Sequence, residues 1–300
     1  MRFKQIELGD RAKIYPDLYK AEKAICDLSF TNLYGWATHY STSWAVTEEG
    51  VLVIRFQSPL YSHPVFLLPY CPDMHVWETT ILQIKETTTK SATPLVFMGV
   101  TPLCAENLEA LFPNSFSFSW NENLADYVYL RERMVTLSGK KLQSKRNHIN
   151  RFKKLYPDYS FRQLTSSDIP LYKDFADKWL QKEQSRDGVE AENKMIHRIL
   201  DAHEELELSG GALLVGEQLV AITLGSPINY DTFDVHVEKA DTDFEGAYTV
   251  INNEFAKVIP ENYLYINREE DLGIPGLRFA KESYQPEKRL LKGMALLKNN

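Results

Sequence analysis

The sequence has few cysteines and no long apolar run. Its three cysteines, Cys26, Cys71 and Cys104, are widely spaced and all lie in the first half of the chain. An odd, scattered set is typical neither of a disulfide framework nor of a zinc site, and it indicates reduced thiols in a cytoplasmic protein. No stretch approaches the roughly 18 apolar residues of a membrane helix, and the N-terminus lacks the apolar segment of a signal peptide. We therefore expect a cytoplasmic protein with no stable membrane insertion.

Motifs for several kinds of catalysis are also missing. The seven histidines form neither a His-Glu-x-x-His motif nor a pair four residues apart. Acidic runs alone are a poor signal for magnesium, so we expect no metal site. The nucleophile elbow of hydrolases and the Walker loop of nucleotide-binding proteins are absent too, and these classes are not indicated.

The composition is that of a soluble globular protein, with 44% hydrophobic and 25% charged residues in a chain of 300. Such a length fits two domains of about 150 residues or one large domain. The net charge of −7 argues against nucleic acid binding over the whole surface. A local basic patch is still compatible with that charge.

Short strands and helices alternate along the chain. In the first half, strands are expected at 2–8, 43–46, 51–56, 64–70, 95–100, 116–119 and 127–130, and helices at 10–25, 73–85 and 105–111. The second half follows the order β-α-α-β-β-β-α-β-α-β. Its strands are expected at 159–164, 212–215, 219–224, 232–238, 263–267 and 289–296, and its helices after Ser167, at 191–208, from Glu245 to Pro260 and at 277–284.

The stretch from Phe233 to Tyr284 combines an apolar strand with dense charge. Alternation at period two predicts that His236 and Glu238 share one polar face of the strand 233–239. Thr242 and Glu245 match a capping box, so the next helix should begin near Glu245. Its buried stripe should contain Tyr248, Ile251, Phe255 and Val258. A second strand beside the first would complete a βαβ unit whose helix N-terminus favours an anion.

A basic segment lies between the two halves, and no acidic residue occurs from Met134 to Pro157. It predicts a helix capped by Ser138. Six of its side chains are candidates for binding phosphate or RNA: Lys140, Lys141, Lys145, Arg146, Asn147 and Arg151. The alternative, a solvated linker helix, remains open.

The order of elements in the second half resembles the acyltransferase fold called GNAT, after the Gcn5-related N-acetyltransferases. The basic segment 140–152, the stretch from His236 to Asp241 and the stretch from Asn267 to Gly273 resemble a bacterial family grouped with the C-terminal catalytic domain of phosphatidylglycerol lysyltransferase. The resemblance implies an α/β (α+β, mixed-sheet) protein made of two tandem GNAT-like domains. We expect a degenerate domain at 1–137, a basic linker helix at 138–157, and at 158–300 a second domain that carries the site.

By resemblance, the protein would be an acyl or aminoacyl transferase. The donor would be aminoacyl-tRNA or another activated acyl group such as acyl-CoA, and no tightly bound cofactor is expected. The acceptor would be an amine or hydroxyl on a small molecule, a lipid headgroup or a peptide. The pyrophosphate loop of typical GNAT domains is reduced here to Gly246-Ala247, and Asp241, Asp243 and Glu245 would oppose a pyrophosphate. This disfavours an acetyl-CoA-dependent N-acetyltransferase, which stays as an alternative.

Acyl transfer needs a base for the acceptor's proton and donors for the oxyanion. Glu238 or His236 is the candidate base, and Tyr284 the candidate proton donor to the leaving group. The candidate substrate-binding residues are Lys239, Asp241, Asn267, Arg268, Glu269, Glu270, Asp271, Arg278 and Lys281. A solvated sheet face and an internal salt-bridge network are the structural alternatives. A non-enzymatic scaffold that binds RNA or a protein partner through the basic helix is the alternative function.

Overall fold

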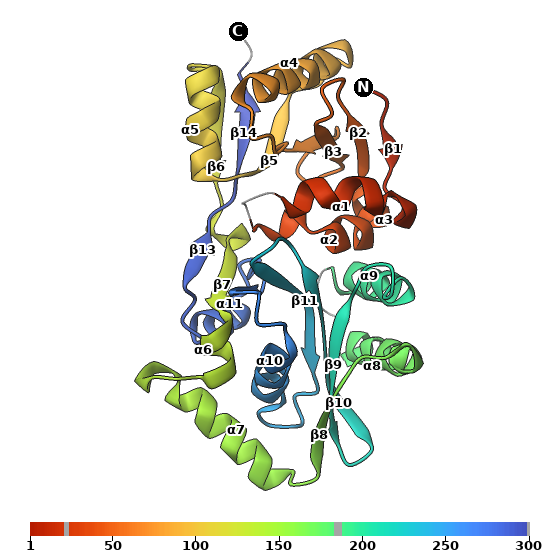
Figure 1. Cartoon of the computed structure of the whole chain (residues 1–300), viewed down its shortest axis with the longest axis vertical. Coiled ribbons are helices and arrows are strands. Elements are labelled where there is room, and N and C mark those ends of the chain that lie inside the picture. The colour runs from red at the N-terminus through yellow and green to blue at the C-terminus, as the bar shows by residue number, and fades with distance from the viewer. Residues whose placement is uncertain (21–23, 183–187, 299–300) are drawn as a thin grey trace. The chain divides into compact units, whose positions relative to one another are not determined.

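The computed structural model describes residues 1–20, 24–182 and 188–298. The chain folds into two compact units (Figure 1). The first unit comprises Met1–Asp126, Glu270–Gly273 and Arg289–Asn300, and the second comprises Tyr127–Glu269 and Ile274–Lys288. Each unit therefore contains segments from distant parts of the sequence.

A seven-stranded sheet in the order β1-β2-β3-β4-β5-β14-β6 forms the first unit. Its strands are β1 (Lys4–Gln5), β2 (Ser43–Val46), β3 (Leu52–Phe56), β4 (Val65–Leu67), β5 (Val96–Val100), β14 (Gly293–Leu297) and β6 (Phe116–Trp120). The expected hairpin is confirmed as β2 and β3. Only β4 and β5 are paired in parallel among these neighbours.

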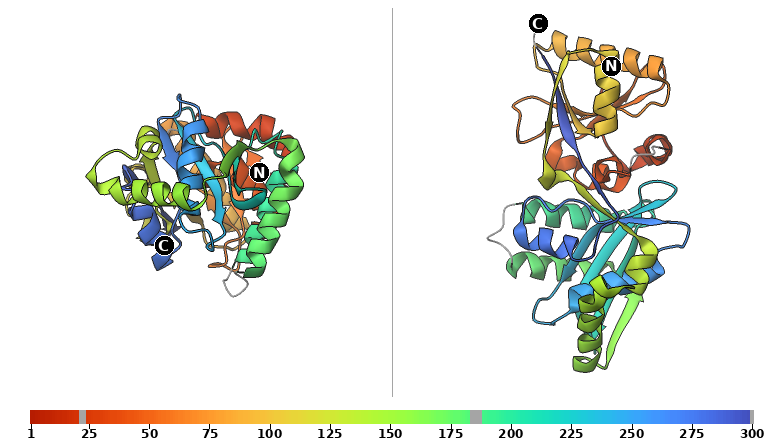
Figure 2. Two further views of the ribbon diagram at one scale, coloured as in Figure 1. Left: turned by 90° about the horizontal axis from the view of Figure 1, so that it is seen from below. Right: turned by 90° about the vertical axis from the view of Figure 1, so that its left-hand side faces the viewer.

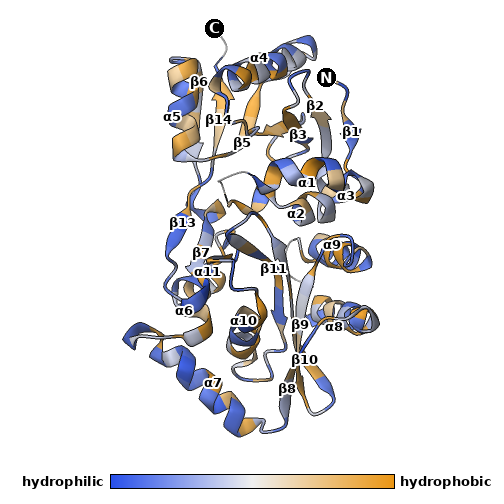
Figure 3. Ribbon diagram, in the orientation of Figure 1, coloured by the Kyte–Doolittle hydropathy of each residue, from blue (hydrophilic) through white to orange (hydrophobic). Residues whose placement is uncertain are grey.

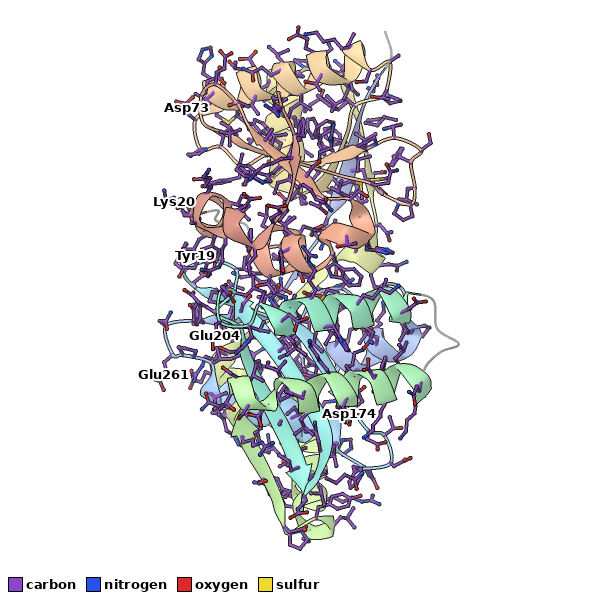
Figure 4. All side chains as sticks on the ribbon, turned by 90° about the vertical axis from the view of Figure 1, so that its right-hand side faces the viewer. Tyr19, Lys20, Asp73, Asp174, Glu204 and Glu261 are labelled. Carbon is purple, nitrogen blue, oxygen red and sulfur yellow. The ribbon has the colours of Figure 1, made fainter. Side chains whose placement is uncertain are left out.

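Two helices pack on this sheet through one apolar core. Trp77 and Ile81 of α4 (Met74–Lys90) and Leu108 of α5 (Pro102–Leu111) join Phe97 in that core. Asp73 accepts hydrogen bonds from the backbone of His75 and Val76, which explains where α4 begins (Figure 4). The shorter helices of the unit are α1 (Arg11–Tyr19), α2 (Phe30–Gly35) and α3 (Ala37–Tyr40). The helix expected at 10–25 is shorter in the structure, where α1 ends at Tyr19 and Ala24 and Ile25 are not helical, and residues 21–23 lie outside the described residues.

The second sheet has the order β13-β7-β12-β11-β10-β9-β8. Its strands are β13 (Lys288–Leu290), β7 (Asp126–Leu130), β12 (Tyr265–Asn267), β11 (Thr232–Ala240), β10 (Gln218–Pro227), β9 (Ser209–Val215) and β8 (Tyr159–Gln163). The strands β11 and β12 are parallel, so the expected βαβ unit is confirmed.

The helices of the second unit cover both faces of its sheet (Figure 1). One face carries α10 (Ala247–Val258), which shares its apolar core with α6 (Arg131–Thr136) and α7 (Gln143–Leu155), and α11 (Pro275–Glu282) follows β12. The other face carries α8 (Ile169–Lys182) and α9 (Val189–Asp201). The ribbon of α7 is hydrophilic over most of its length (Figure 3). None of the helices in residues 1–20, 24–182 and 188–298 combines the length and apolarity needed to cross a membrane.

Two strands join a sheet other than the one that their position in the sequence suggested. β14 lies between β5 and β6 in the first sheet, where Ala295 pairs with Phe97. β7 lies beside β12 in the second sheet, where Tyr129 pairs with Ile266. The pairing partner of a strand depends on buried side chains far away in sequence, which element order does not reveal. The observed units consequently have other bounds than the expected domains 1–137, 138–157 and 158–300.

The caps predicted for three helices are wrong. The helix α10 begins at Ala247 after Gly246, whose φ is 95°, and Glu245 pairs with Arg151 instead of capping. The helix α8 follows a capping box made by Thr165, not a cap by Ser167. A short 3-10 turn separates Ser138 from α7, which begins at Gln143.

The apolar stripe predicted for α10 is only partly right. Ile251 and Phe255 are buried and Val258 packs against the same core. Tyr248 is exposed, although Ala247, Thr249 and Val250 in the same turn are buried, so its side chain lies on the outer face of the helix.

A β-bulge at His236 overturns the predicted alternation of β11. Leu224 of β10 pairs with Val237, but the next residue, Gly225, pairs with Val235. The strand β11 therefore contains one extra residue, which reverses the faces of all residues after it. Accordingly Val235 and Ala240 both belong to the α10 core, and Glu238 faces α10 as well. His236 and Glu238 do not share one polar face of a regular strand.

Candidate functional site

The parallel strands β11 and β12 pair over only three residues. Thr232 to Asp234 pair with Tyr265 to Asn267, and β12 then ends. Arg268, the next residue, still bonds through its backbone N–H to Tyr127 of β7. Its side chain crosses to Glu238, further along β11. Open α/β sheets place their ligands at such strand ends.

Arg268, Glu238 and Asn252 form the centre of the candidate site. Arg268 Nη2 donates to Glu238 Oε1 over 2.7 Å, and Asn252 Nδ2, on α10, donates to Glu238 Oε2 over 2.8 Å. Both oxygens of the Glu238 carboxylate are thus engaged. The ion pair is largely withdrawn from solvent, with 10% of the Arg268 side chain and 12% of the Glu238 side chain exposed.

The Nη1 nitrogen of Arg268 has no hydrogen-bond partner among the described residues. Among the described residues, Nη1 is buried without a hydrogen-bond acceptor, and Asn252 Oδ1 is buried without a donor. Burial alone would lower the pKa of Arg268. The neighbouring Glu238, Tyr129 and Tyr284 have the opposite and larger effect, so the pKa is raised. A charged donor held in place without an acceptor is suited to an electron-rich ligand atom.

Two tyrosines border the guanidinium. Its carbon lies 5.0 Å from the ring centroid of Tyr284 and 5.7 Å from that of Tyr129. Burial raises the pKa of Tyr284 to about 12, so its hydroxyl stays protonated. Tyr129 donates to the backbone carbonyl of Lys281, and Lys281 Nζ donates to the backbone carbonyl of Arg268. Lys281 therefore holds the backbone of the site together, a position compatible with its predicted role near the substrate.

Lys145, which the sequence assigned to the basic helix surface, belongs to this group. Its Nζ lies 4.1 Å from the ring centroid of Tyr284. Burial and the neighbouring Arg268 lower the pKa of Lys145 to about 8, against the opposing effect of Glu238. No pattern in the sequence distinguishes it from the exposed lysines nearby.

His236 belongs to a different group. Its Nε2 lies 2.8 Å from Ser226 Oγ, and its Nδ1 lies 3.2 Å from Glu269 Oε1 and 3.4 Å from Asp234 Oδ2. The imidazole is fully buried. The bulge thus directs His236 and Glu238, the two candidate bases, toward different partners.

The residues of the polar run 267–271 have different partners. Asn267 accepts a hydrogen bond from the backbone of Glu269 over 2.7 Å, and Asp271 accepts one from Gly273 over 2.7 Å. Glu270 contacts Lys292 in the first unit. Arg278 lies partly exposed on α11. Of the predicted substrate-binding run, only Arg268 reaches Glu238.

The acidic turn before α10 is already paired with cations. Lys182 lies 2.8 Å from Asp241 and 3.3 Å from Asp243. Lys239 lies on the opposite face from Glu238, 3.0 Å from Glu192 and 3.4 Å from the ring centroid of Trp179. The two Lys182 pairs reduce the repulsion that the sequence predicted between the turn and an anionic ligand.

The remaining residues of the predicted phosphate-binding set have different surroundings. Arg146 Nη1 donates to the backbone carbonyls of Leu137 and Gly139, so it stabilises the turn before α7. Asn147 accepts from Gln143 over 2.9 Å, and Arg151 pairs with Glu245 over 2.8 Å. Lys140 and Lys141 are exposed.

A buried charge cluster within the first unit was not predicted from the sequence. Lys292 Nζ lies 2.8 Å from Asp126, 2.6 Å from Asp27 and 3.3 Å from Cys26 Sγ, and it also contacts Glu270. Burial and the three carboxylates raise the pKa of Cys26 well above its usual range. The sequence does not indicate that these residues are neighbours. Lys292 lies beside Cys26 because β14, which follows Lys292, belongs to the first sheet.

In the part of the chain that the structure describes, two groups of side chains have the donor types of a metal site: Asp234, His236 and Glu269 in the second unit, and Cys26, Asp126 and Glu270 in the first. The first unit's group already surrounds the Lys292 ammonium, which supplies the positive charge that a metal would bring. The sequence expectation of no metal site remains a prediction.

Comparison with known proteins places this chain in a family. The family model for the C-terminal part of phosphatidylglycerol lysyltransferase matches residues 20–295. A conserved protein of unknown function from Bacteroides thetaiotaomicron is 42% identical, with 99% of each chain covered and a TM-score of 0.94.

Two more distant structures share the fold. One is the C-terminal domain of a protein named as a lysylphosphatidylglycerol synthetase from Agrobacterium fabrum, at 11% identity and a TM-score of 0.69, covering 97% of this chain and 92% of that one. The other is a tandem GNAT protein of the clavulanic acid pathway, at 8% identity and a TM-score of 0.53, covering 100% and 99%. The expected tandem GNAT-like architecture is confirmed. The chain therefore belongs to the phosphatidylglycerol lysyltransferase C-terminal family, which is of the acyl or aminoacyl transferase kind.

Proposed function

We propose that the group around Arg268 transfers an aminoacyl group from aminoacyl-tRNA to a hydroxyl or amine acceptor. One observation carries this proposal: Arg268 Nη1 is buried, charged and without an acceptor among the described residues. Attack on an acyl carbon places negative charge on the carbonyl oxygen. A fixed donor without a ground-state partner stabilises that charge with no reorganisation.

Glu238 and Asn252 orient the guanidinium in this mechanism. Glu238 accepts from Nη2, and Asn252 holds the other oxygen of the same carboxylate. The free Nη1 is thereby fixed in direction as well as charge. The tyrosine rings of Tyr129 and Tyr284 keep water away from it.

The exposed lysines of α7 support a tRNA donor. Lys140, Lys141, Lys153 and Lys154 are exposed and lie on or just before a helix with no acidic residue. Such a surface attracts phosphates in a salt-dependent manner. Acyl-CoA is the second candidate donor, since the tandem GNAT protein shares the fold and the acidic turn before α10 is neutralised by Lys182 and Arg151.

The family description supports one acceptor class as the first candidate. Because the matching model is named for phosphatidylglycerol lysyltransferase, a lipid headgroup hydroxyl is the first acceptor to test. Small amines and peptides are the others.

The test is a transfer assay with radiolabelled bulk aminoacyl-tRNA and, in separate reactions, phosphatidylglycerol vesicles, a peptide and a small amine. We expect label to move to one acceptor, and Arg268→Gln to reduce the rate about 10²- to 10³-fold, as for loss of one oxyanion donor. Lys178→Ala, at an exposed position of α8, is the matched control and should keep the wild-type rate.

Two results would count against this function. Saturable binding of deacylated tRNA without any transfer would favour the RNA-binding scaffold. Transfer from acetyl-CoA alone would favour the acetyltransferase alternative.

A further inference from the structure

Lys145 differs from the other lysines near α7 in its surroundings. Lys140, Lys141 and Lys153 are exposed, whereas Lys145 is partly buried with its Nζ 4.1 Å from the Tyr284 ring centroid. In the described part of the chain, no carboxylate or carbonyl oxygen accepts a hydrogen bond from this nitrogen. It is thus an amine in the candidate site that is not committed to an ion pair.

The two bases suggested by the sequence are poorly placed by comparison. Both oxygens of Glu238 already accept hydrogen bonds, from Arg268 and from Asn252. His236 is directed to Ser226, Asp234 and Glu269 by the bulge of β11. If Glu238 took up a proton, it would lose its ion pair with Arg268, and the contacts of His236 lie with other residues than Arg268.

We propose that Lys145 is the general base of the site, taking the proton of the acceptor as the acceptor attacks the acyl carbon held at Arg268. This inference rests on the proposed acyl transfer. It assigns to the chemistry a residue that the sequence placed among the RNA contacts.

The charges around Lys145 suit that role. Arg268 is a nearby cation that lowers the pKa of Lys145, and Glu238 is a nearby carboxylate that raises it. Tyr129 and Tyr284 stay protonated because burial raises their pKa values. Burial and Arg268 together bring the pKa of Lys145 to about 8. About a tenth of the molecules would then carry the neutral amine at pH 7, compared with a vanishing share for an ordinary lysine of pKa about 10.4. A base poised near the working pH is the most effective one.

The proton and the electron pairs balance without any further reactant. The acceptor oxygen or nitrogen forms a bond to the acyl carbon, its proton passes to Lys145 Nζ, and the carbonyl electron pair moves onto the oxygen at Arg268 Nη1. The tetrahedral intermediate then collapses and the bond between the acyl carbon and the donor oxygen breaks. The Lys145 ammonium returns its proton to that leaving oxygen.

The first test needs no substrate. The intact protein is pulsed with acetic anhydride at a series of pH values, and acetylation of each lysine is measured by mass spectrometry against N-acetyl-lysine amide. We expect Lys145 to label half-maximally near pH 8. In Arg268→Gln, its midpoint should move to higher pH because the neighbouring cation is gone. A Lys145 midpoint at or above that of the free amide would overturn the inference.

The second test uses the transfer reaction. Lys145→Ala should lose about 10²-fold or more in kcat, the usual range for a general base, and methylamine in the buffer should restore part of that rate. Lys145→Arg keeps the charge and remains protonated at all working pH values, so it should be as slow and show no rescue. The wild-type rate should rise with pH up to about 8, and this dependence should vanish in both variants.

The two proposals fail in different ways. If the wild-type protein transfers no acyl group from any donor, the proposed function fails whatever the labelling shows. If the wild type is active but Lys145→Ala retains its rate and pH profile, Lys145 is a packing residue and only this inference falls.

Discussion

Arg268 Nη2 lies 2.7 Å from Glu238 Oε1, and this contact joins the end of β12 to the bulged half of β11. It exists because the extra residue at His236 turns Glu238 toward α10. Without the bulge, Glu238 would point to the face that carries α8 and α9. A backbone irregularity thus decides which charged side chain meets the arginine.

Loss of Glu238 should destabilise the fold. In Glu238→Ala the Arg268 guanidinium stays buried without its carboxylate, and breaking a buried pair in this way typically costs about 3–5 kcal/mol. Urea denaturation followed by circular dichroism would measure the change in the free energy of unfolding. The double variant Glu238→Gln/Arg268→Met removes both charges, and its loss of stability should be smaller than the sum of the losses in Glu238→Gln and in Arg268→Met. Additive losses would show that the pair is not coupled.

The bulge itself can be tested at Gly225. A Cβ at this position would lie 2.3 Å from the backbone oxygen of Asp234 and 2.6 Å from the Phe233 ring. Gly225→Ala should therefore lower the free energy of unfolding by about 1–3 kcal/mol, as overpacking does.

Gly276 in α11 is the matched control, since a Cβ there meets nothing within 4 Å. Alanine is the better helix former, so Gly276→Ala should stabilise by up to about 1 kcal/mol. Thermal denaturation of both variants would show opposite shifts in Tm. A neutral Gly225→Ala would mean that β10 and β11 can move apart at little cost.

The local sequence pattern predicted most of the helices and strands. The hairpin 43–46 and 51–56, the βαβ unit and the order of the second half as far as α11 follow from apolar periodicity and turn residues, and the structure has them. The single strand expected at 289–296 is instead two strands, β13 and β14, which belong to different sheets. Resemblance supplied the tandem GNAT-like fold. The exchanged strands β7 and β14 were not predictable, because their partners are set by packing between distant segments.

The candidate site was predicted in part. Arg268, Glu238, Tyr284 and Lys281 were named from their place beside an apolar strand, and the structure brings them together. Lys145 was named for a different reason, and Asn252 and Tyr129 were missed. An asparagine within a helix and a tyrosine in a strand carry no sign of a partner, and a bulge shifts faces without a sequence signature.

The basic segment that includes α7 and the turn before it gives a prediction that distinguishes tRNA binding from the thermal stability of the fold. Lys140→Ala/Lys141→Ala removes two exposed charges, so it should reduce the slope of log binding constant against log salt by roughly two while leaving Tm unchanged. Arg146→Ala should instead lower Tm, because Arg146 holds the carbonyls of Leu137 and Gly139. Fluorescence anisotropy with labelled tRNA at several salt concentrations gives the slopes. Equal slopes for the wild type and the double variant would rule out phosphate contacts by these lysines.

The buried cluster of the first unit should make stability depend on pH in an unusual direction. Burial, opposed by Lys292, raises the pKa of Asp126 from 3.8 to about 6. The folded state then binds more protons at this carboxyl than the unfolded state between about pH 4 and pH 6. For Asp126 alone, the free energy of unfolding falls as pH rises through this window, by up to about 1.4 kcal/mol per pH unit.

Asp126→Asn should remove that dependence, because the amide oxygen can still accept from the backbone of Cys26, which lies 2.7 Å from Asp126. Asp10 is the control of opposite sign: burial would raise its pKa, but hydrogen bonds from Lys4 and Trp44 lower it. Asp10 therefore adds to the free energy of unfolding at neutral pH, and this addition is lost as pH falls. Asp10→Asn should lower the free energy of unfolding least in acid. Urea denaturation at pH 4.5, 5.2, 6 and 7 would give the difference in the free energy of unfolding between each variant and the wild type. If the Asp126→Asn difference does not change between pH 4.5 and 6, the carboxyl is ionised throughout and Lys292 alone determines its charge.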